Sequence, residues 1–170
     1  MPSSLPPDAP LLILATPGGT EGSAAEIAHL VGVDNPHIEV RLTAVAELGE
    51  ALPAERTAIV VPLLLWHDPQ VMASLRHFES EDVIVTGPLG PHPLLAEALH
   101  IRLAEKGLAR VDRMRLLSVS SPVDAVVLAI VGGDRAVYEA QSTAVLLASR
   151  LTLPVVAASL DGEPGGICLR

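Results

Sequence analysis

The chain has 170 residues, of which 49% are hydrophobic, and a formal net charge of −9 at pH 7. This length suits one domain with a real core. The acidic balance disfavours nucleic acid as a partner, because a protein that binds phosphates needs a basic stripe. One phenylalanine, one tryptophan and one tyrosine are also too few for a base-stacking platform.

The hydrophobic runs are too short and too often interrupted to form a membrane helix of about 20 residues. The single cysteine, Cys168, excludes an internal disulfide framework and fits a reducing compartment. Residues 1–10 lack the positive patch and apolar core of a signal peptide, so we expect a flexible tail there. Together these features predict a cytoplasmic protein that contacts no membrane.

Strand and helix signals alternate along the chain. Continuous apolar runs, which are typical of parallel strands buried on both faces, predict strands at Leu11–Thr16, Ile38–Leu42, Thr57–Leu65, Val83–Thr86, Ala125–Val131 and Leu153–Ala157. Apolar residues at helical spacing predict three helices, which carry Ala24, Ile27, Ala28 and Val31, then Val71, Leu75 and Phe78, and then Val137, Ala140, Ala144, Leu147 and Leu151. Val71, Leu75 and Phe78 are expected to form the inner stripe of the second helix. The segment Ala44–Leu52 is weakly helical.

Two helix boundaries have clear chemical signals. Asp68-Pro69 is a strong helix start, because an acidic N-cap is followed by proline at the first helical position. Pro93 opens a further helix, and Gly107 is expected to end it.

The later part of the chain resembles a restart of the first. The strand Ala125–Val131 leads into Gly132-Gly133 and a helix, as the opening strand leads into Gly18-Gly19 and a helix. The prediction is one doubly wound, mostly parallel α/β sheet over residues 11–170, with helices on both faces. Residues 11–115 are its first module, and 124–170 begin an incomplete second repeat.

Histidines follow two of the predicted strands. His67 and His92 each stand just beyond a strand's carboxyl end, where loops and helix N-termini converge on ligands in open α/β sheets. We expect both at the same edge of the sheet, near Gly18 and Gly133. The other histidines, His29, His37, His77 and His100, are expected at the surface or its boundary.

The glycine turns do not predict a nucleotide site. TPGGTEG and VGGDRA contain neither the GxGxxG fingerprint nor a GK[ST] phosphate loop. The paired glycines indicate tight turns that let a helix pack closely, and the helix N-termini there can still hold a carboxylate. A basic cluster, formed by Lys106, Arg110, Arg113 and Arg115, is either a solvated face near a helix C-terminus or a docking patch for a polycarboxylate or an acidic partner.

Over roughly Leu11–Leu151 the chain resembles the class II sirohydrochlorin chelatases, which insert cobalt, iron or nickel into a tetrapyrrole. The resemblance is carried by LLILATPGGTEGSAAEIA, VVPLLLWHDPQV, TGPLGPHPLLAEAL and VVLAIVGGDRAVYEAQ. It implies a chelatase-type α/β module with its ligand at the carboxyl edge of the sheet, and a divalent metal and a tetrapyrrole as substrates.

The chain departs from this family where the family's chemistry lies. The resemblance implies a histidine at the position of Pro17, a second histidine at Gln70, and a glutamate near Thr43 or Ala44. Proline and alanine can neither bind a metal nor accept a pyrrole proton. The ordinary chelatase site is therefore missing.

Two interpretations stay open. In the first, the site has moved: His67, Asp68 and His92 bind a divalent metal, the two histidines act as catalytic bases, and the turn glycines Gly18, Gly19, Gly90, Gly132 and Gly133 line the ligand. In the second, Asp68 caps a helix, His92 bonds to a loop carbonyl, and the chain is a non-catalytic subunit. Because the repeat is incomplete, we expect a homo-oligomer or a complex with a chelatase-like partner.

Overall fold

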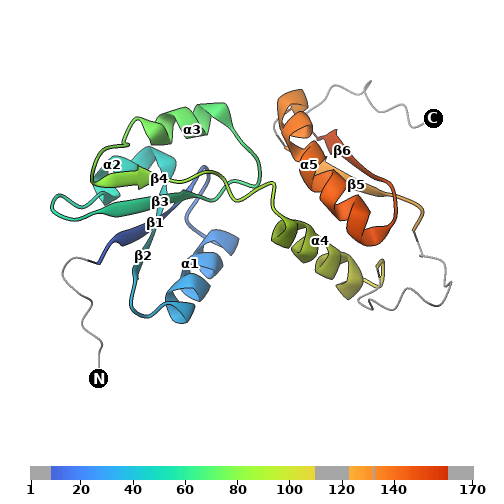
Figure 1. Cartoon of the computed structure of the whole chain (residues 1–170), viewed down its shortest axis with the longest axis horizontal. Coiled ribbons are helices and arrows are strands. Elements are labelled where there is room, and N and C mark those ends of the chain that lie inside the picture. Colours follow the sequence, from blue (N-terminus) through green and yellow to red (C-terminus); the bar gives the residue numbers. More distant parts are fainter. Residues whose placement is uncertain (1–8, 110–122, 132, 161–170) are drawn as a thin grey trace. The chain divides into compact units, whose positions relative to one another are not determined.

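The computed structural model describes residues 9–109, 123–131 and 133–160, and the chain divides into two compact units, Met1–Leu89 and Gly90–Arg170. The first unit contains β1 (Leu11–Thr16), α1 (Ser23–Asp34), β2 (Glu39–Ala44), a 3-10 turn (Val45–Glu47), α2 (Leu48–Ala51), β3 (Ala58–Pro62), α3 (Pro69–Arg76) and β4 (Val83–Val85). The second unit contains α4 (Pro93–Glu105), β5 (Val126–Ile130), α5 (Gly133–Leu151) and β6 (Val155–Ser159) (Figure 1).

The first unit is built on a four-stranded parallel sheet with the order β2-β1-β3-β4. The register pairs Leu11 of β1 with Glu39 of β2 on one side and with Ala58 of β3 on the other. Figure 1 shows α1 on one side of this sheet and α2 and α3 on the other. The prediction of a mostly parallel α/β sheet with helices on both faces is therefore confirmed for the first unit.

The hydrophobic core of the first unit lies on the side of the sheet that α2 and α3 cover. Leu48 from α2, together with Met72 and Leu75 from α3, packs against alternate residues of the strands. Those strand residues are Leu11, Ile13, Ala15, Ala58, Val60 and Val83. The alternation follows from the period-2 geometry of a strand, which directs every second side chain to the same face.

On the opposite face, α1 packs loosely against β2, and none of the twelve residues of α1 is buried. Ala24, Ala28 and Val31 are half-buried, whereas Ile27 is 40% exposed. The helix predicted from these four residues is confirmed, although Ile27 is exposed. In α3 the predicted Leu75 is buried, and Met72, which the prediction omitted, is buried beside it.

The second unit has its own two-stranded sheet, in which β5 pairs with β6 in parallel. Within the described residues β5 has no other strand partner, so the prediction that Ala125–Val131 joins the main sheet was wrong. Helix α5 packs against both β6 and α4. Alternating strand and helix signals predict each crossover, but they carry no information on which sheet a strand joins, because that pairing is non-local.

Gly107 ends α4 as predicted. Its φ is +70°, its N–H donates to the carbonyl of Ala104, and the N–H of Leu108 donates to the carbonyl of Leu103. These two bonds form a Schellman motif, whose left-handed residue favours glycine. Of the predicted basic cluster, Lys106 is the C-cap residue of α4 and is exposed, while Arg110, Arg113 and Arg115 lie outside the described residues.

None of the helices in the described part of the chain is both long enough and apolar enough to cross a membrane.

Candidate functional site

The strand order of the first unit defines one edge of its sheet as the candidate site. The chain leaves β1 for α1 on one side of the sheet, and it leaves the neighbouring β3 for α3 on the other side. The two connections therefore diverge beyond the carboxyl ends of β1 and β3. In open α/β sheets, ligands bind at the point where neighbouring connections diverge in this way, which is called the switch point. We call the end of the sheet that contains this point the carboxyl edge.

The connection after β1, residues 17–22, is exposed throughout. The N–H of Gly18 donates to the Thr16 hydroxyl oxygen at 3.3 Å. A Cβ added at Gly18 or Gly19 would meet no atom within 4 Å. The prediction that these two glycines let a helix pack closely was therefore wrong, and the space in front of them is open.

The N-terminus of α1 follows this connection. Gly22 is its N-cap residue with a φ of +63°, and no side chain caps the helix. Glu26 already places a carboxylate in the first turn, where it interacts favourably with the helix dipole. Because that carboxylate would repel an anion, we assign no anion site to this helix end.

The connection after β3 carries His67. The N–H of Leu63 donates to the carbonyl of Ala15 at 2.8 Å, which ties the start of this loop to the end of β1. Leu64 is buried in the core, whereas Trp66 and His67 are half-buried. Among the described residues, no hydrogen bond or ion pair engages the His67 imidazole. His67 is thus available to a ligand.

Asp68 caps α3, as the sequence predicts. Its Oδ1 accepts the N–H of Gln70 at 2.9 Å and the N–H of Val71 at 3.1 Å. Both bonds use the same oxygen, so Oδ2 alone is left for a metal. The role of Asp68 as a metal ligand stays a prediction.

His92 also caps a helix. The N–H of Leu94 donates to its Nδ1 at 3.2 Å, at the start of α4. The accepting Nδ1 carries no proton, so the proton of the neutral imidazole lies on Nε2. A metal at Nε2 would require the proton to move to Nδ1, which would break the cap. Capping α4 and binding a metal through Nε2 therefore exclude each other.

The signal for this cap was present in the sequence, since His92 directly precedes a proline at the first helical position. The bond that the structure shows is accepted by the His92 Nδ1, and a bond from His92 to a loop carbonyl stays a prediction. His92 belongs to the second unit and His67 to the first. That the two histidines lie together at one edge stays a prediction.

The remaining predicted ligand-lining glycines belong to the second unit. Gly90 is buried, and Gly133 begins α5 with a φ of +69° and open space around it. Gly132 lies outside the described residues.

The positions at which the resemblance predicts the chelatase ligands carry neither a histidine nor a carboxylate. Pro17 and Gln70 are exposed, while Thr43 is 5% exposed and its hydroxyl donates to the carbonyl of Ala44 at 3.3 Å. In residues 9–109, 123–131 and 133–160, no three His, Cys, Asp or Glu side chains lie close enough together to hold a metal ion.

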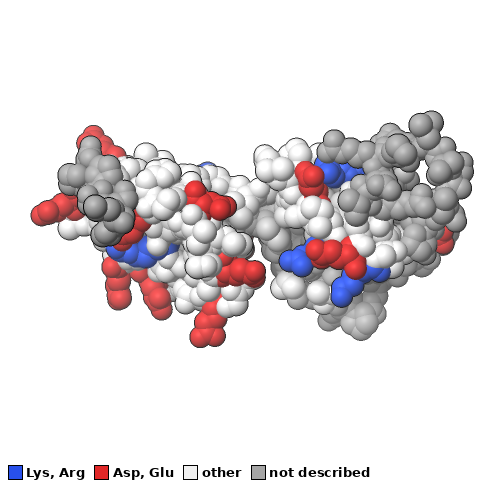
Figure 2. Space-filling model, turned by 90° about the horizontal axis from the view of Figure 1, so that it is seen from below, with Lys and Arg blue, Asp and Glu red and all other residues white. Residues whose placement is uncertain are grey.

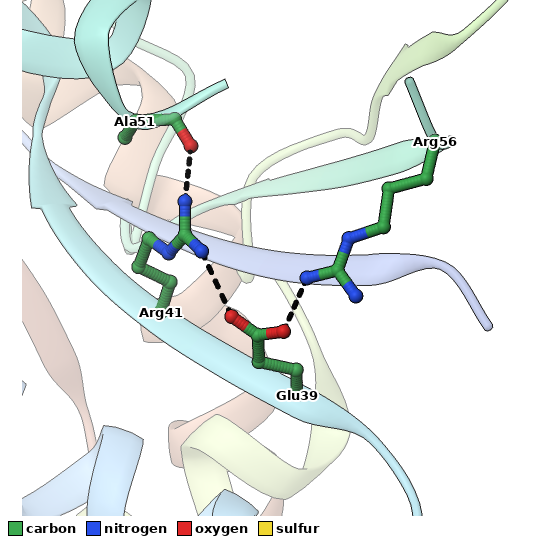
Figure 3. Close-up of polar contacts among 4 residues, drawn as sticks. All are labelled: Glu39, Arg41, Ala51 and Arg56. Atoms are coloured by element: carbon green, nitrogen blue, oxygen red, sulfur yellow. Dashed lines mark hydrogen bonds and ion pairs between the residues drawn. The ribbon is translucent and has the colours of Figure 1, made fainter. Parts of the chain in front are cut away.

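The first unit's clearest charged cluster, which the sequence analysis missed, lies at the opposite, amino edge of the sheet (Figure 3). The Glu39 carboxylate pairs with Arg56, just before β3, and with Arg41 at 2.8 Å. Arg41 also donates to the carbonyl of Ala51, at the end of α2, at 2.7 Å. Hydrogen bonds from Arg56 and then Arg41 hold the pKa of Glu39 below its usual range.

This cluster joins β2, α2 and the entry to β3, so we assign it to stability rather than to the site. Its sequence signal is the Glu-x-Arg spacing, which places Glu39 and Arg41 on the same face of a strand. On the face drawn in Figure 2, the acidic side chains of the first unit are spread out, and much of the visible surface is uncharged. No charged patch marks the site on that face.

No known family model matches the chain, and no curated protein or solved structure is significantly similar to it.

Proposed function

We propose that the first unit binds a polycarboxylate tetrapyrrole of the sirohydrochlorin type at the carboxyl edge, and that this chain alone inserts little or no metal into it. The observation that carries the proposal is the strand order β2-β1-β3-β4, whose switch point lies between β1 and β3. The open glycine loop and His67, whose imidazole has no partner among the described residues, flank that point. The ligand class rests on the resemblance to sirohydrochlorin chelatases, since fold alone does not define a function.

The absence of turnover follows from the side chains at the reactive positions. Pro17, Gln70 and Ala44 offer neither an imidazole nor a carboxylate, the groups that would bind a transition metal and accept the pyrrole protons. His92 is engaged through Nδ1 in capping α4. Loss of one acid–base group commonly slows a reaction by about 10²–10⁴-fold, and here the metal ligands are missing too. Background rates of insertion are therefore expected with Co²⁺ or Fe²⁺.

The test is an absorbance titration of sirohydrochlorin with purified protein, with and without Co²⁺. A saturable shift of the tetrapyrrole spectrum without cobalt insertion is expected. Trp66 is the chain's single tryptophan and precedes His67, so quenching of its emission reports binding at this edge. No shift and no quenching would refute the proposal. Robust turnover would overturn the non-catalytic part.

Variants locate the ligand. Gly18→Ala adds a methyl group into open space, so it should leave folding intact and weaken binding if the ligand occupies that space. His67→Ala should weaken binding, whereas His37→Ala, which removes an exposed histidine just before β2, is the matched control. If turnover were robust and either His67→Ala or His92→Ala abolished it, the site would have moved to those histidines.

A second candidate function is that of a non-catalytic subunit that pairs with an intact chelatase-like partner. The observation that favours it is the exposure of Ile27, Leu30 and Val33 on α1, at 40%, 52% and 60%. Contiguous exposed apolar side chains of this kind mark interaction surfaces. Co-purification with a full-length chelatase-like protein, lost in Leu30→Gln, would support this function. A monomer that binds sirohydrochlorin alone would argue against it.

A further inference from the structure

Large apolar side chains are exposed at the carboxyl edge of the first unit. Leu65 is 49% exposed and Leu89 is 42% exposed, and Trp66 lies half-buried beside Leu65. The chain has only three aromatic residues, and its core cluster in this unit is mainly aliphatic. The sole tryptophan is therefore not used as a central core residue but is placed in a loop at the ligand edge.

This loop is fixed at both ends. Leu64 is 6% exposed and packs in the core, and Asp68 caps α3 through two backbone hydrogen bonds. The loop between these two fixed residues, which we call the arch, consists of Leu65, Trp66 and His67. A short anchored arch presents its side chains with little conformational freedom left to lose on binding.

A hydrogen bond joins the arch to the connection after β4. The N–H of Leu89 donates to the carbonyl of Leu64 at 2.8 Å, and upstream the N–H of Thr86 donates to the carbonyl of Val60 at 2.9 Å. These bonds continue the pairing of β3 and β4 beyond the sheet. The backbone of Leu89 is therefore held next to that of Leu64, at the start of the arch.

We propose that Leu65, Trp66 and Leu89 form an apolar platform that contacts the flat ring face of the bound ligand. This inference rests on the proposed function and adds the chemistry of the contact: a planar conjugated ring packs on the platform, with the His67 imidazole beside it. Burial of apolar surface and offset stacking on the indole supply the attraction. A polycarboxylate without a ring has no surface to offer these side chains.

The test compares wild type with Trp66→Ala, Trp66→Phe and Leu89→Ala, following the ligand's own absorbance. With sirohydrochlorin, Trp66→Ala should bind about tenfold more weakly or worse, Leu89→Ala should also weaken binding, and Trp66→Phe should retain part of the affinity. Tyr138→Ala is the matched control, because it removes a 77% exposed aromatic side chain from the second unit. Citrate, a polycarboxylate without a ring, should bind weakly, and Trp66→Ala should not change that.

The outcomes separate the two proposals. If wild type binds sirohydrochlorin and all three variants bind equally well, the platform is wrong and the proposed function stands. If wild type does not bind it, both fail. If Trp66→Ala does not fold, Trp66→Phe and Leu89→Ala still decide the question. If Trp66→Ala changes the oligomeric state but not the affinity, the platform is a protein contact and this inference is overturned.

Discussion

The two β-α-β segments of the chain, β1–α1–β2 and β5–α5–β6, have the same order of elements and the same parallel pairing. The two segments differ in which element is buried: the strand β1 in the first and the helix α5 in the second. In the first segment, five of the six β1 residues are buried and no residue of α1 is. In the second, α5 buries Ala136, Ala140, Thr143, Ala144 and Leu147, whereas of the β5 residues only Ile130 is buried.

Neighbours account for this difference. β1 lies between two strands, and α2 and α3 provide the core on its far face, while α1 packs mainly against β2. β5 has one strand partner among the described residues, and α5 packs against β6 on one side and α4 on another. Burial of an element is thus set by how many elements surround it. The amphipathic pattern of a helix does not by itself determine it.

The largest expected effect comes from removing a fully buried leucine in each unit. Leu75→Ala in the first unit and Leu147→Ala in the second both truncate side chains that are 0% exposed. Each should lower the free energy of unfolding by about 2–5 kcal/mol. Leu75→Ala should have the larger effect, because Leu75 belongs to a core cluster of ten buried residues that can collapse little into the cavity.

Urea denaturation followed by circular dichroism measures both changes, and Trp66 fluorescence reports the first unit separately. A larger loss for Leu147→Ala than for Leu75→Ala would contradict this expected order.

The helix caps give the next largest effect. Asp68→Ala removes a carboxylate cap from α3, whereas His92→Ala removes an imidazole cap from α4. Asp68→Ala should cost about 1 kcal/mol, because two backbone N–H groups lose their acceptor and the helix dipole loses an anion. His92→Ala should cost less, since a single bond to a neutral ring is lost.

Asp68→Asn is the control, because the amide oxygen can still cap the helix and stability should be largely retained. Thermal unfolding of the four proteins, wild type included, gives the order. Equal losses for Asp68→Ala and Asp68→Asn would show that charge, and not the hydrogen bonds, stabilises α3.

The Glu39 cluster gives a pH-dependent effect in the first unit. Arg56 and Arg41 lower the pKa of Glu39 in the folded state, so the folded state binds a proton there less readily than the unfolded state does. The stability from these pairs is present above the ordinary pKa of a glutamate. It is lost as the pH falls through the lowered pKa of folded Glu39. The loss should be at most about 1 kcal/mol, because the side chains are partly exposed to solvent.

Glu39→Gln should lower stability at neutral pH and flatten its fall on acidification. Glu55→Gln, an exposed carboxylate in the loop before Arg56, is the matched control and should leave the profile unchanged. Urea midpoints measured from neutral to acidic pH test this. If the urea midpoints of Glu39→Gln and wild type fell equally with pH, the ion pairs of Glu39 would not stabilise the first unit.

Local signals predicted most elements of the fold, because periodicity and capping depend on residues close in sequence. Asp68-Pro69 and Gly107 marked helix boundaries that the structure confirms. The separate sheet of β5 and the exposure of Ile27 were not predictable, because both depend on which distant elements pack together. Sequence alone cannot decide between a strand that joins an existing sheet and one that starts another.

The candidate site was predictable to a similar extent. The position of His67 beyond the end of β3 follows from the strand pattern, and the structure agrees with it. The engagement of the His92 Nδ1 depends on the rotamer and backbone geometry of a helix start, which the sequence indicates only through Pro93. The Glu39 cluster joins residues that are 17 positions apart, so only the folded chain brings Arg56 to it.

The smallest expected effect tests whether the apolar side chains of α1 are exposed in solution, as the comparison of α1 with α5 assumes. Leu30→Gln on α1 and Val145→Gln on α5 replace side chains that are 52% and 63% exposed. Both should change the free energy of unfolding by no more than about 0.5 kcal/mol, because exposed side chains lose little on replacement. Urea denaturation at two protein concentrations, with light scattering for the mass, measures this. A destabilisation by Leu30→Gln that grows with protein concentration, without a matching change for Val145→Gln, would mean that a second copy covers α1. The exposed helix of the first unit would then be an interface, and the contrast with α5 would disappear in the assembly.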